Sequence, residues 1–219
     1  MHIEDGLLTP FWLALGWVLV LPVLLLAARN VRWQFLRERG TVFGLAALFV
    51  LALWSVRAGI YPGLNVHLLG GMLLTLMFGP WPAMLVLAGL VVLLAGFGVG
   101  GWWSLGVNLM ALAVVPVLAA YGILRVVEKH LPSHFFIYIF VVAFIGSALT
   151  IAAMSAVVTF FLLISNAYTL HFLIDNWLIS MILDAWGEAL TTGMLITLMV
   201  VYRPYLVSTF DDNRYLKGK

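Results

Sequence analysis

Long apolar runs constrain the fold of this 219-residue chain more than any other feature of the sequence. Hydrophobic residues make up 64% of it and charged residues only 9%, whereas soluble domains are about 45–50% apolar and about 25% charged. Eleven basic and nine acidic side chains are too few to solvate a globule of this size. The composition excludes a soluble enzyme, a disordered chain and a nucleic-acid binder. It predicts an all-α, polytopic membrane helical bundle in a lipid bilayer.

The apolar runs predict about seven transmembrane helices in one membrane domain covering residues 1–206, followed by a cytoplasmic tail at residues 207–219. The expected spans are roughly Phe11–Ala28, Thr41–Val56, His67–Phe78, a run after Gly79-Pro80-Trp81-Pro82 that ends near Phe97, Leu105–Leu124, Phe135–Ile164 and Trp177–Tyr202. The third run is too short to cross a bilayer unless irregular backbone extends it, since a span needs about 20 residues.

The basic residues orient this bundle. Ten of the eleven fall in alternate polar stretches, and only Arg57 lies outside them: Arg29, Arg32, Arg37, Arg39, Arg125, Lys129, Arg203, Arg214, Lys217 and Lys219. Loops on the cytoplasmic side of a membrane carry an excess of Lys and Arg. The distribution therefore predicts an N-terminus outside and a C-terminus inside, and an even number of spans would not keep these residues on one side.

Several classes of chemistry are missing from the sequence. The chain has no cysteine, which excludes thiolate metal sites and cysteine nucleophiles. It contains no phosphate-binding glycine loop, HExxH motif or nucleophile elbow. We therefore expect neither an enzyme nor an organic cofactor, and any step driven by ATP would need another chain. The N-terminus also lacks the positive region of a signal peptide, so the first residue is expected to be retained.

The first two residues form a specific chelating unit. The Met1 amine, the deprotonated His2 amide and the His2 ring nitrogen close a five-membered and a six-membered ring around one metal ion, with all three nitrogens in a plane. A further imidazole, such as that of His67, would complete a planar set that favours Ni(II) or Cu(II), with Co(II) accommodated less comfortably, over tetrahedral Zn(II). The alternatives are an exposed His2 at a frayed terminus and a His67 that merely begins a helix.

Other polar residues are weaker candidates for the site. Asp184 and Glu188 lie one turn apart in the seventh run, and intramembrane carboxylates suggest a function. They favour either a transport path or a structural contact with Ser, Thr or Asn108 on neighbouring helices. Asn65 and the pair His171 and Asp175 lie on the predicted outer side, where they could act as a second shell, pathway or lid.

Several blocks, in order along the chain, carry a family resemblance. They are Met1-His2-Ile3-Glu4-Asp5-Gly6, His67-Leu68-Leu69-Gly70-Gly71 leading to Gly79-Pro80-Trp81, residues 98–108, Gly187-Glu188-Ala189-Leu190-Thr191-Thr192, and Arg203-Pro204. Together they resemble the cobalt/nickel substrate-specific membrane component of energy-coupling factor transporters, from residue 1 to about 206. The chain departs from the family pattern at Glu4, at Asn65-Val66 and at Met181.

The resemblance implies a seven-helix bundle whose extracytoplasmic N-terminus inserts into the protein. It implies that Ni2+ or Co2+ is the transported substrate, held by the Met1 amine, the His2 amide and imidazole, and His67. It also implies ATPase and transmembrane coupling subunits on the cytoplasmic side of a prokaryotic inner membrane. The competing hypothesis is a membrane metal-binding or sensor protein that does not transport, with Cu(II) as one candidate ion.

Overall fold

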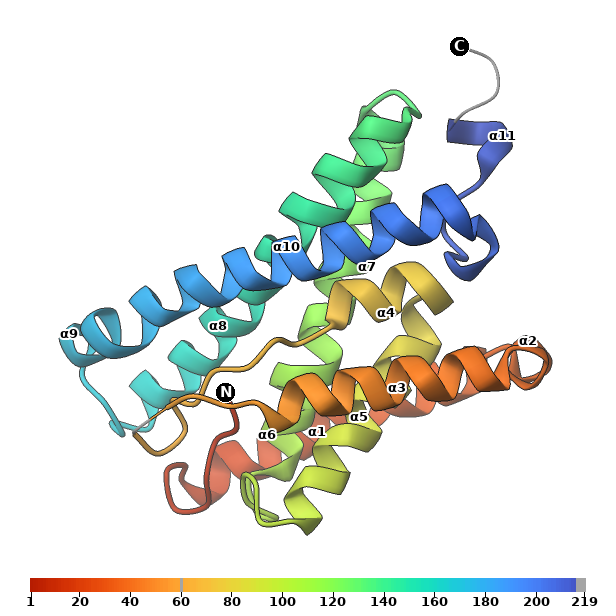
Figure 1. The fold of residues 1–219 in the computed structure, drawn as a ribbon. Coiled ribbons are helices and arrows are strands. Elements are labelled where there is room, and N and C mark those ends of the chain that lie inside the picture. Colours follow the sequence, from red (N-terminus) through yellow and green to blue (C-terminus); the bar gives the residue numbers. More distant parts are fainter. Residues whose placement is uncertain (60, 216–219) are drawn as a thin grey trace.

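The computed structural model describes residues 1–59 and 61–215, and it consists of helices joined by turns and loops (Figure 1). The α-helices are α1 (Pro10–Asn30), α2 (Trp33–Glu38), α3 (Gly40–Ser55), α4 (Gly71–Phe78), α5 (Pro80–Gly96), α6 (Leu105–Leu109), α7 (Val115–His130), α8 (Gly146–Ile164), α9 (Leu170–Leu173), α10 (Ile179–Tyr202) and α11 (Asp212–Tyr215). Three π-helical stretches extend them: Met110–Val114 joins α6 to α7, Ile137–Ile145 leads into α8, and Ile174–Leu178 joins α9 to α10. The predicted all-α class is confirmed, since the only extended pairing in the described residues is one bridge between Ala58 and Val66.

Four continuous helices in the described chain are long and apolar enough to cross a membrane: Pro10–Asn30, Leu105–His130, Ile137–Ile164 and Leu170–Tyr202. Two shorter apolar helices, α3 and α5, have 16 and 17 residues. The molecule is thus a helical membrane bundle, as its composition predicts. The count of seven spans and their orientation stay predictions.

Two of the predicted spans begin elsewhere in the structure. The third predicted span corresponds to α4, which starts at Gly71 and not at His67, because Gly70 adopts a left-handed backbone conformation with φ of +72°. His67 therefore lies in a non-helical loop. The helix predicted from Trp177 starts seven residues earlier, at Leu170, where the Thr169 hydroxyl accepts a hydrogen bond from the Phe172 amide at 3.3 Å. The sequence Gly79-Pro80-Trp81-Pro82 also predicts a tight turn before the fourth span, but only Gly79 lies outside the helices, and Pro80 begins α5.

The helices differ in how deeply they are buried, which distinguishes a central helix from a peripheral one. The segment Leu105–His130 has 61% of its most apolar window buried, whereas Pro10–Asn30 has 17%. Large apolar side chains such as Phe11, Leu45, Leu183 and Trp186 lie on the outer surface of the bundle with more than half of their area exposed. Such a broad apolar surface suits lipid and would aggregate in water.

Close backbone packing holds α1 against α6, the helix that leads into the central segment. A Cβ built on Gly106 would lie 2.8 Å from the Trp17 nitrogen and 3.1 Å from the Gly16 carbonyl carbon. Small residues at such crossings let membrane helices approach closely. The two glycines therefore set the distance between α1 and α6.

We expect Gly106→Ala to destabilise the fold, because backbone atoms of α1 cannot move aside as a flexible side chain would. Overpacking of this kind costs about 1–3 kcal/mol, and each kcal/mol lowers the Tm of a chain of this size by about 2–4 °C. Thermal unfolding in detergent measures the shift. Gly122→Ala on α7 is the matched control, since its Cβ would meet nothing within 4 Å. Equal Tm values for the two variants would contradict the packing argument.

The two ends of the bundle differ in structure. Figure 1 shows α2 and α11 at one end, while α9 lies at the other, with the first residue of the chain between the helices on that side. The segment after α10 folds back onto α4, since the Ser208 amide donates to the Met77 carbonyl at 3.1 Å. Val207, Phe210 and Tyr215 of the predicted tail are buried.

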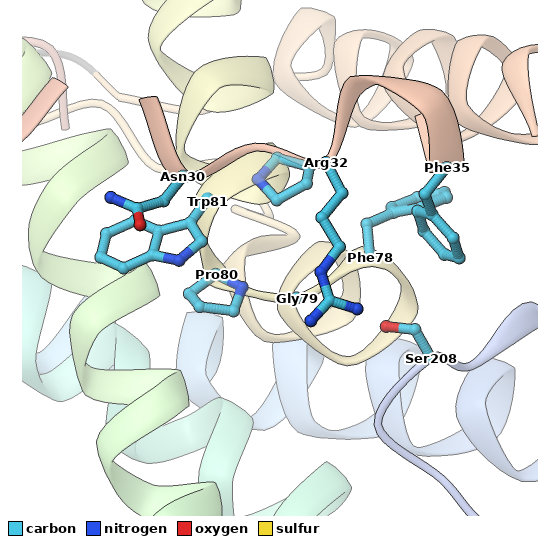
Figure 2. Close-up of a pocket in the computed structure, with 9 residues that line it drawn as sticks. Asn30, Arg32, Phe35, Phe78, Gly79, Pro80, Trp81 and Ser208 are labelled. Atoms are coloured by element: carbon cyan, nitrogen blue, oxygen red, sulfur yellow. The ribbon is translucent and has the colours of Figure 1, made fainter. Parts of the chain in front are cut away.

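A cavity of about 500 Å³ opens at the end that carries α2. Its lining comes from the end of α1, from α2 and the residue before it, from the junction of α4 and α5, and from the segment after α10: Asn30, Arg32, Phe35, Phe78, Gly79, Pro80, Trp81, Pro82 and Ser208. The Arg32 side chain extends into it toward Gly79 and Ser208 (Figure 2). This end of the molecule therefore presents a hollow with a cationic group.

Candidate metal centre

The first residues of the chain enter the bundle as a non-helical segment. Met1, His2 and Ile3 each have 0% of their surface exposed. Asn108, at the end of the predicted block 98–108, fixes this segment with two hydrogen bonds: its Oδ1 accepts from the Ile3 amide at 2.8 Å, and its Nδ2 donates to the Ile3 carbonyl at 2.9 Å. The predicted alternative of an exposed, frayed His2 is therefore wrong for this structure.

Ser104, the residue before α6, holds the segment further along the chain, at Glu4 and Asp5. Its backbone amide donates to the Asp5 carboxylate at 2.9 Å, and its hydroxyl donates to the Glu4 carbonyl at 3.1 Å. Gly100 lies against the segment, since a Cβ there would sit 3.3 Å from the His2 Cβ, and its φ of +72° disfavours other residues. The loop before α6 is therefore shaped around the terminus.

Asn65 meets the terminus from the loop between α3 and α4. The Met1 amine donates to the Asn65 backbone carbonyl and, at 2.7 Å, to the Asn65 side-chain Oδ1. The His2 amide also donates to Oδ1, at 3.3 Å. Asn65 thus holds the amine and the amide, two of the predicted donor nitrogens, on one side-chain oxygen.

His67 places a second imidazole beside that of His2. The His2 and His67 rings have their centroids 5.3 Å apart and are inclined by 32°. Three of their nitrogens, both of His2 and Nε2 of His67, are buried without a hydrogen-bond partner. Buried polar atoms in native proteins are nearly always paired, so these orphaned nitrogens point to a ligand that accepts lone pairs. His67 Nδ1 lies 3.3 Å from the Leu68 carbonyl, and donation there leaves Nε2 its lone pair.

Burial keeps the donors of the N-terminal segment neutral. This segment precedes α1, and burial is the main cause that lowers the pKa of both the Met1 amine and the His2 imidazole well below their usual ranges. The neighbouring His67 lowers the pKa of His2 further. Metal ions bind the deprotonated forms of such groups, so the nitrogens are held in the form that coordinates.

Trp54, at the end of α3, packs against both imidazoles. Its ring centroid lies 4.9 Å from that of His67 and 5.6 Å from that of His2. Its Nε1 donates to the Leu69 carbonyl at 3.0 Å. No local pattern marks this role in the sequence, where Trp54 is one of nine tryptophans.

The predicted carboxylates have different surroundings. Glu188 is 1% exposed and accepts hydrogen bonds from the backbone amides of Leu69 at 2.8 Å and Gly70 at 2.7 Å. The partners of Glu188 are therefore main-chain amides and not the Asn108, Ser or Thr side chains named as alternatives from the sequence. Asp184 is 6% exposed, and its Oδ2 has no hydrogen-bond partner.

His171 stays apart from this cluster in its interactions. Its Nδ1 lies 2.7 Å from an Asp175 carboxylate oxygen on the surface of the helix Leu170–Tyr202, and its side chain is 88% exposed. Of the predicted residues, Met1, His2, Asn65 and His67 therefore come together, Glu188 joins them through the loop, and the charge of Asp184 acts on the Met1 amine. Within the described residues, no group of three or more His, Cys, Asp or Glu side chains could hold a metal. The candidate centre depends on main-chain nitrogens instead.

These features define a class: a helical membrane protein whose N-terminus is buried in the bundle beside two imidazoles with unpaired nitrogens. The family model for the cobalt uptake substrate-specific transmembrane region (CbiM) matches residues 2–206. The chain belongs to this family.

Relatives and a solved structure agree with that assignment. The "Cobalt transport protein CbiM" of Clostridium cellulovorans is 33% identical over 134 residues, which are 59% of this chain and 51% of the relative. The "Probable fused nickel transport protein LarMN" of Lactiplantibacillus plantarum is 31% identical over 132 residues, 59% of this chain and 40% of the relative. A crystal structure of a truncated transition metal transporter superposes with a TM-score of 0.80 at 25% identity, covering 92% of this chain and 99% of that one.

The chain spans about half the length of the curated relatives it matches. These relatives carry names of transport proteins and not of enzymes.

Proposed function

We propose that this chain is the substrate-binding membrane component of an energy-coupling factor transporter that takes up Ni2+ or Co2+ across the cytoplasmic membrane of a prokaryote. The observation that carries the proposal is the convergence of the Met1 amine, the His2 amide and imidazole, and the His67 imidazole in one buried pocket. The names of the relatives, which include cobalt and nickel transport, supply the two candidate ions.

The donor nitrogens favour an ion that prefers square-planar coordination. The amine and the amide close a five-membered chelate ring, the amide and the His2 ring a six-membered one, and His67 takes the fourth position. The His2 amide must lose the proton that it now donates to Asn65, so affinity depends on pH. Ni(II) and Cu(II) favour such a square-planar nitrogen set, whereas Zn(II) prefers tetrahedral ligands.

We propose seven spans with the N-terminus outside, so that the pocket receives metal from the extracytoplasmic side. The donors belong to the N-terminal segment and to the loop after α3, which the charge distribution assigns to the outer side. The basic end with α2 then faces the cytoplasm. Its cavity, with Arg32 extending inward, supports docking of ATPase and coupling subunits there.

We expect His67→Ala to weaken Ni(II) binding by more than the roughly 10- to 100-fold that loss of an outer-shell partner costs, because a direct ligand is removed. Isothermal titration of the purified protein with Ni(II) and Co(II) measures this. His171→Ala is the matched control, since His171 is exposed and pairs with Asp175. If His67→Ala and His171→Ala bind Ni(II) as tightly as the parent chain, the proposed ligand set is wrong.

Uptake of radioactive nickel and cobalt into cells separates transport from binding. Cells with this chain and ATPase and scaffold subunits should accumulate metal, and cells without the chain should not. Equal accumulation in both would overturn the transport proposal and leave a metal-binding or sensor protein. Tighter binding of Cu(II) together with absent nickel or cobalt uptake would favour that second function, since the planar nitrogen set also suits copper.

A further inference from the structure

The Glu188 carboxylate on α10 is tied to the backbone beside His67. Its two oxygens accept from two consecutive amides, those of Leu69 and Gly70, at 2.8 and 2.7 Å. Residues 67–70, here called the His67 loop, are not helical and so leave their amides without intrahelical partners. Glu188 satisfies two of them from a helix more than 100 residues away in the sequence.

The His67 loop is also held from the opposite side. Trp54 on α3 donates its Nε1 hydrogen to the Leu69 carbonyl at 3.0 Å, so Leu69 is bonded in both directions. Gly70 adopts a φ of +72°, and a Cβ there would lie 2.8 Å from a Val50 methyl carbon of α3. The loop backbone is therefore fixed between α3 and α10, and the Trp54 ring lies against the His67 imidazole.

We propose that Glu188 is a positioning residue for the metal, holding the His67 loop so that His67 faces His2. This inference rests on the proposed function. A carboxylate inside a membrane bundle is costly, and simple helix packing would not require one. Only a carboxylate offers two acceptor oxygens to two adjacent amides. A glutamine offers one oxygen and would turn an N–H group toward the other amide, which is why the isosteric change breaks the geometry.

Asp184 provides the comparison within the same helix. It lies one turn before Glu188, is almost as buried, and has an Oδ2 without a hydrogen-bond partner. No hydrogen bond joins it to the His67 loop in the described structure. A change from carboxylate to amide at position 184 therefore has the same chemistry as one at 188 but leaves the loop bonded.

The test is a double-mutant cycle on Ni(II) affinity in the purified full chain. Glu188→Gln should weaken binding by about 10- to 100-fold, the range for outer-shell partners. In a His67→Ala background the same change should add little or no further loss, since the ligand that Glu188 positions is gone. The visible absorption band of bound Ni(II) should shift in Glu188→Gln as it does in His67→Ala. Asp184→Asn should change the Ni(II) affinity by the same factor in the parent chain and in the His67→Ala chain.

Several outcomes would overturn the proposal. Parent-like affinity in Glu188→Gln would do so, as would an equal loss with and without His67, which would indicate a general effect on folding. If Glu188→Gln does not fold, Trp54→Phe replaces it, because this change removes the donor to Leu69 and keeps an aromatic ring over His67. It should weaken Ni(II) binding only while His67 is present, and a loss in both backgrounds would count against the positioning role. A parent chain that binds no Ni(II) would refute the proposed function itself.

Discussion

One extra residue in front of Met1 abolishes tight Ni(II) binding, on the metal centre proposed for this chain. The added residue turns the Met1 amine into an amide and removes a neutral donor from the chelate. It also has no room, because Met1 is fully buried and its nitrogen lies against Asn65. We expect affinity to fall by on the order of 100-fold or more, above the range for outer-shell partners. Competition with a chromophoric chelator measures the loss.

Two controls separate the chemistry of the terminus from its size. Adding the same residue after Lys219 should leave affinity unchanged, since that end is far from the donors in the sequence. Acetylation of Met1 removes the amine with a smaller group and should lower affinity as the extension does. An extended chain that binds Ni(II) or Co(II) as tightly as the parent would show that the terminal amine is not a ligand.

The helical membrane class could be predicted from the sequence because it follows from the average hydrophobicity and charge of long segments. Apolar runs and the clustering of basic residues are properties of whole segments. The chelating unit could be predicted for a different reason, since Met1 and His2 are adjacent and their ring sizes are fixed by covalent geometry. The residues alone made His67 one candidate for the fourth position, and the family resemblance singled it out, because nothing local links it to a residue 65 positions earlier.

Asn65 and Glu188 could be named from the sequence as candidates, but the contacts that support the candidate metal centre could not be predicted. Asn108 binds Ile3 across 105 residues, and Glu188 binds Leu69 across 119. Each contact joins a side chain to main-chain atoms, which any residue type offers, so no pattern in the sequence marks the partner. The start of α4 was misplaced for a similar reason. The run His67–Phe78 is apolar throughout its middle, and only the left-handed backbone at Gly70 separates loop from helix.

The Asn108 contact carries the largest expected loss of folding stability. Asn108→Leu keeps the approximate size of the side chain but leaves the buried amide and carbonyl of Ile3 unpaired. Each unpaired group costs about 1–3 kcal/mol, so both together exceed the expected effect of Gly106→Ala. Ni(II) affinity should fall as well, because His2 precedes the released residue. Thermal unfolding in detergent and hydrogen exchange at the Ile3 amide measure the two consequences.

Asn30→Leu is the matched control for Asn108→Leu. Asn30 is exposed at the end of α1, and its Nδ2 donates to the Leu26 carbonyl at 2.8 Å, where water can replace it. Its Tm and Ni(II) affinity should stay close to those of the parent chain. A slower-exchanging or unchanged Ile3 amide in Asn108→Leu would mean that the terminus stays buried without this clamp. The metal centre would then depend on Asn65, on the Ser104 contacts with Glu4 and Asp5, and on the surrounding packing, because these contacts would still hold the N-terminal segment beside His67.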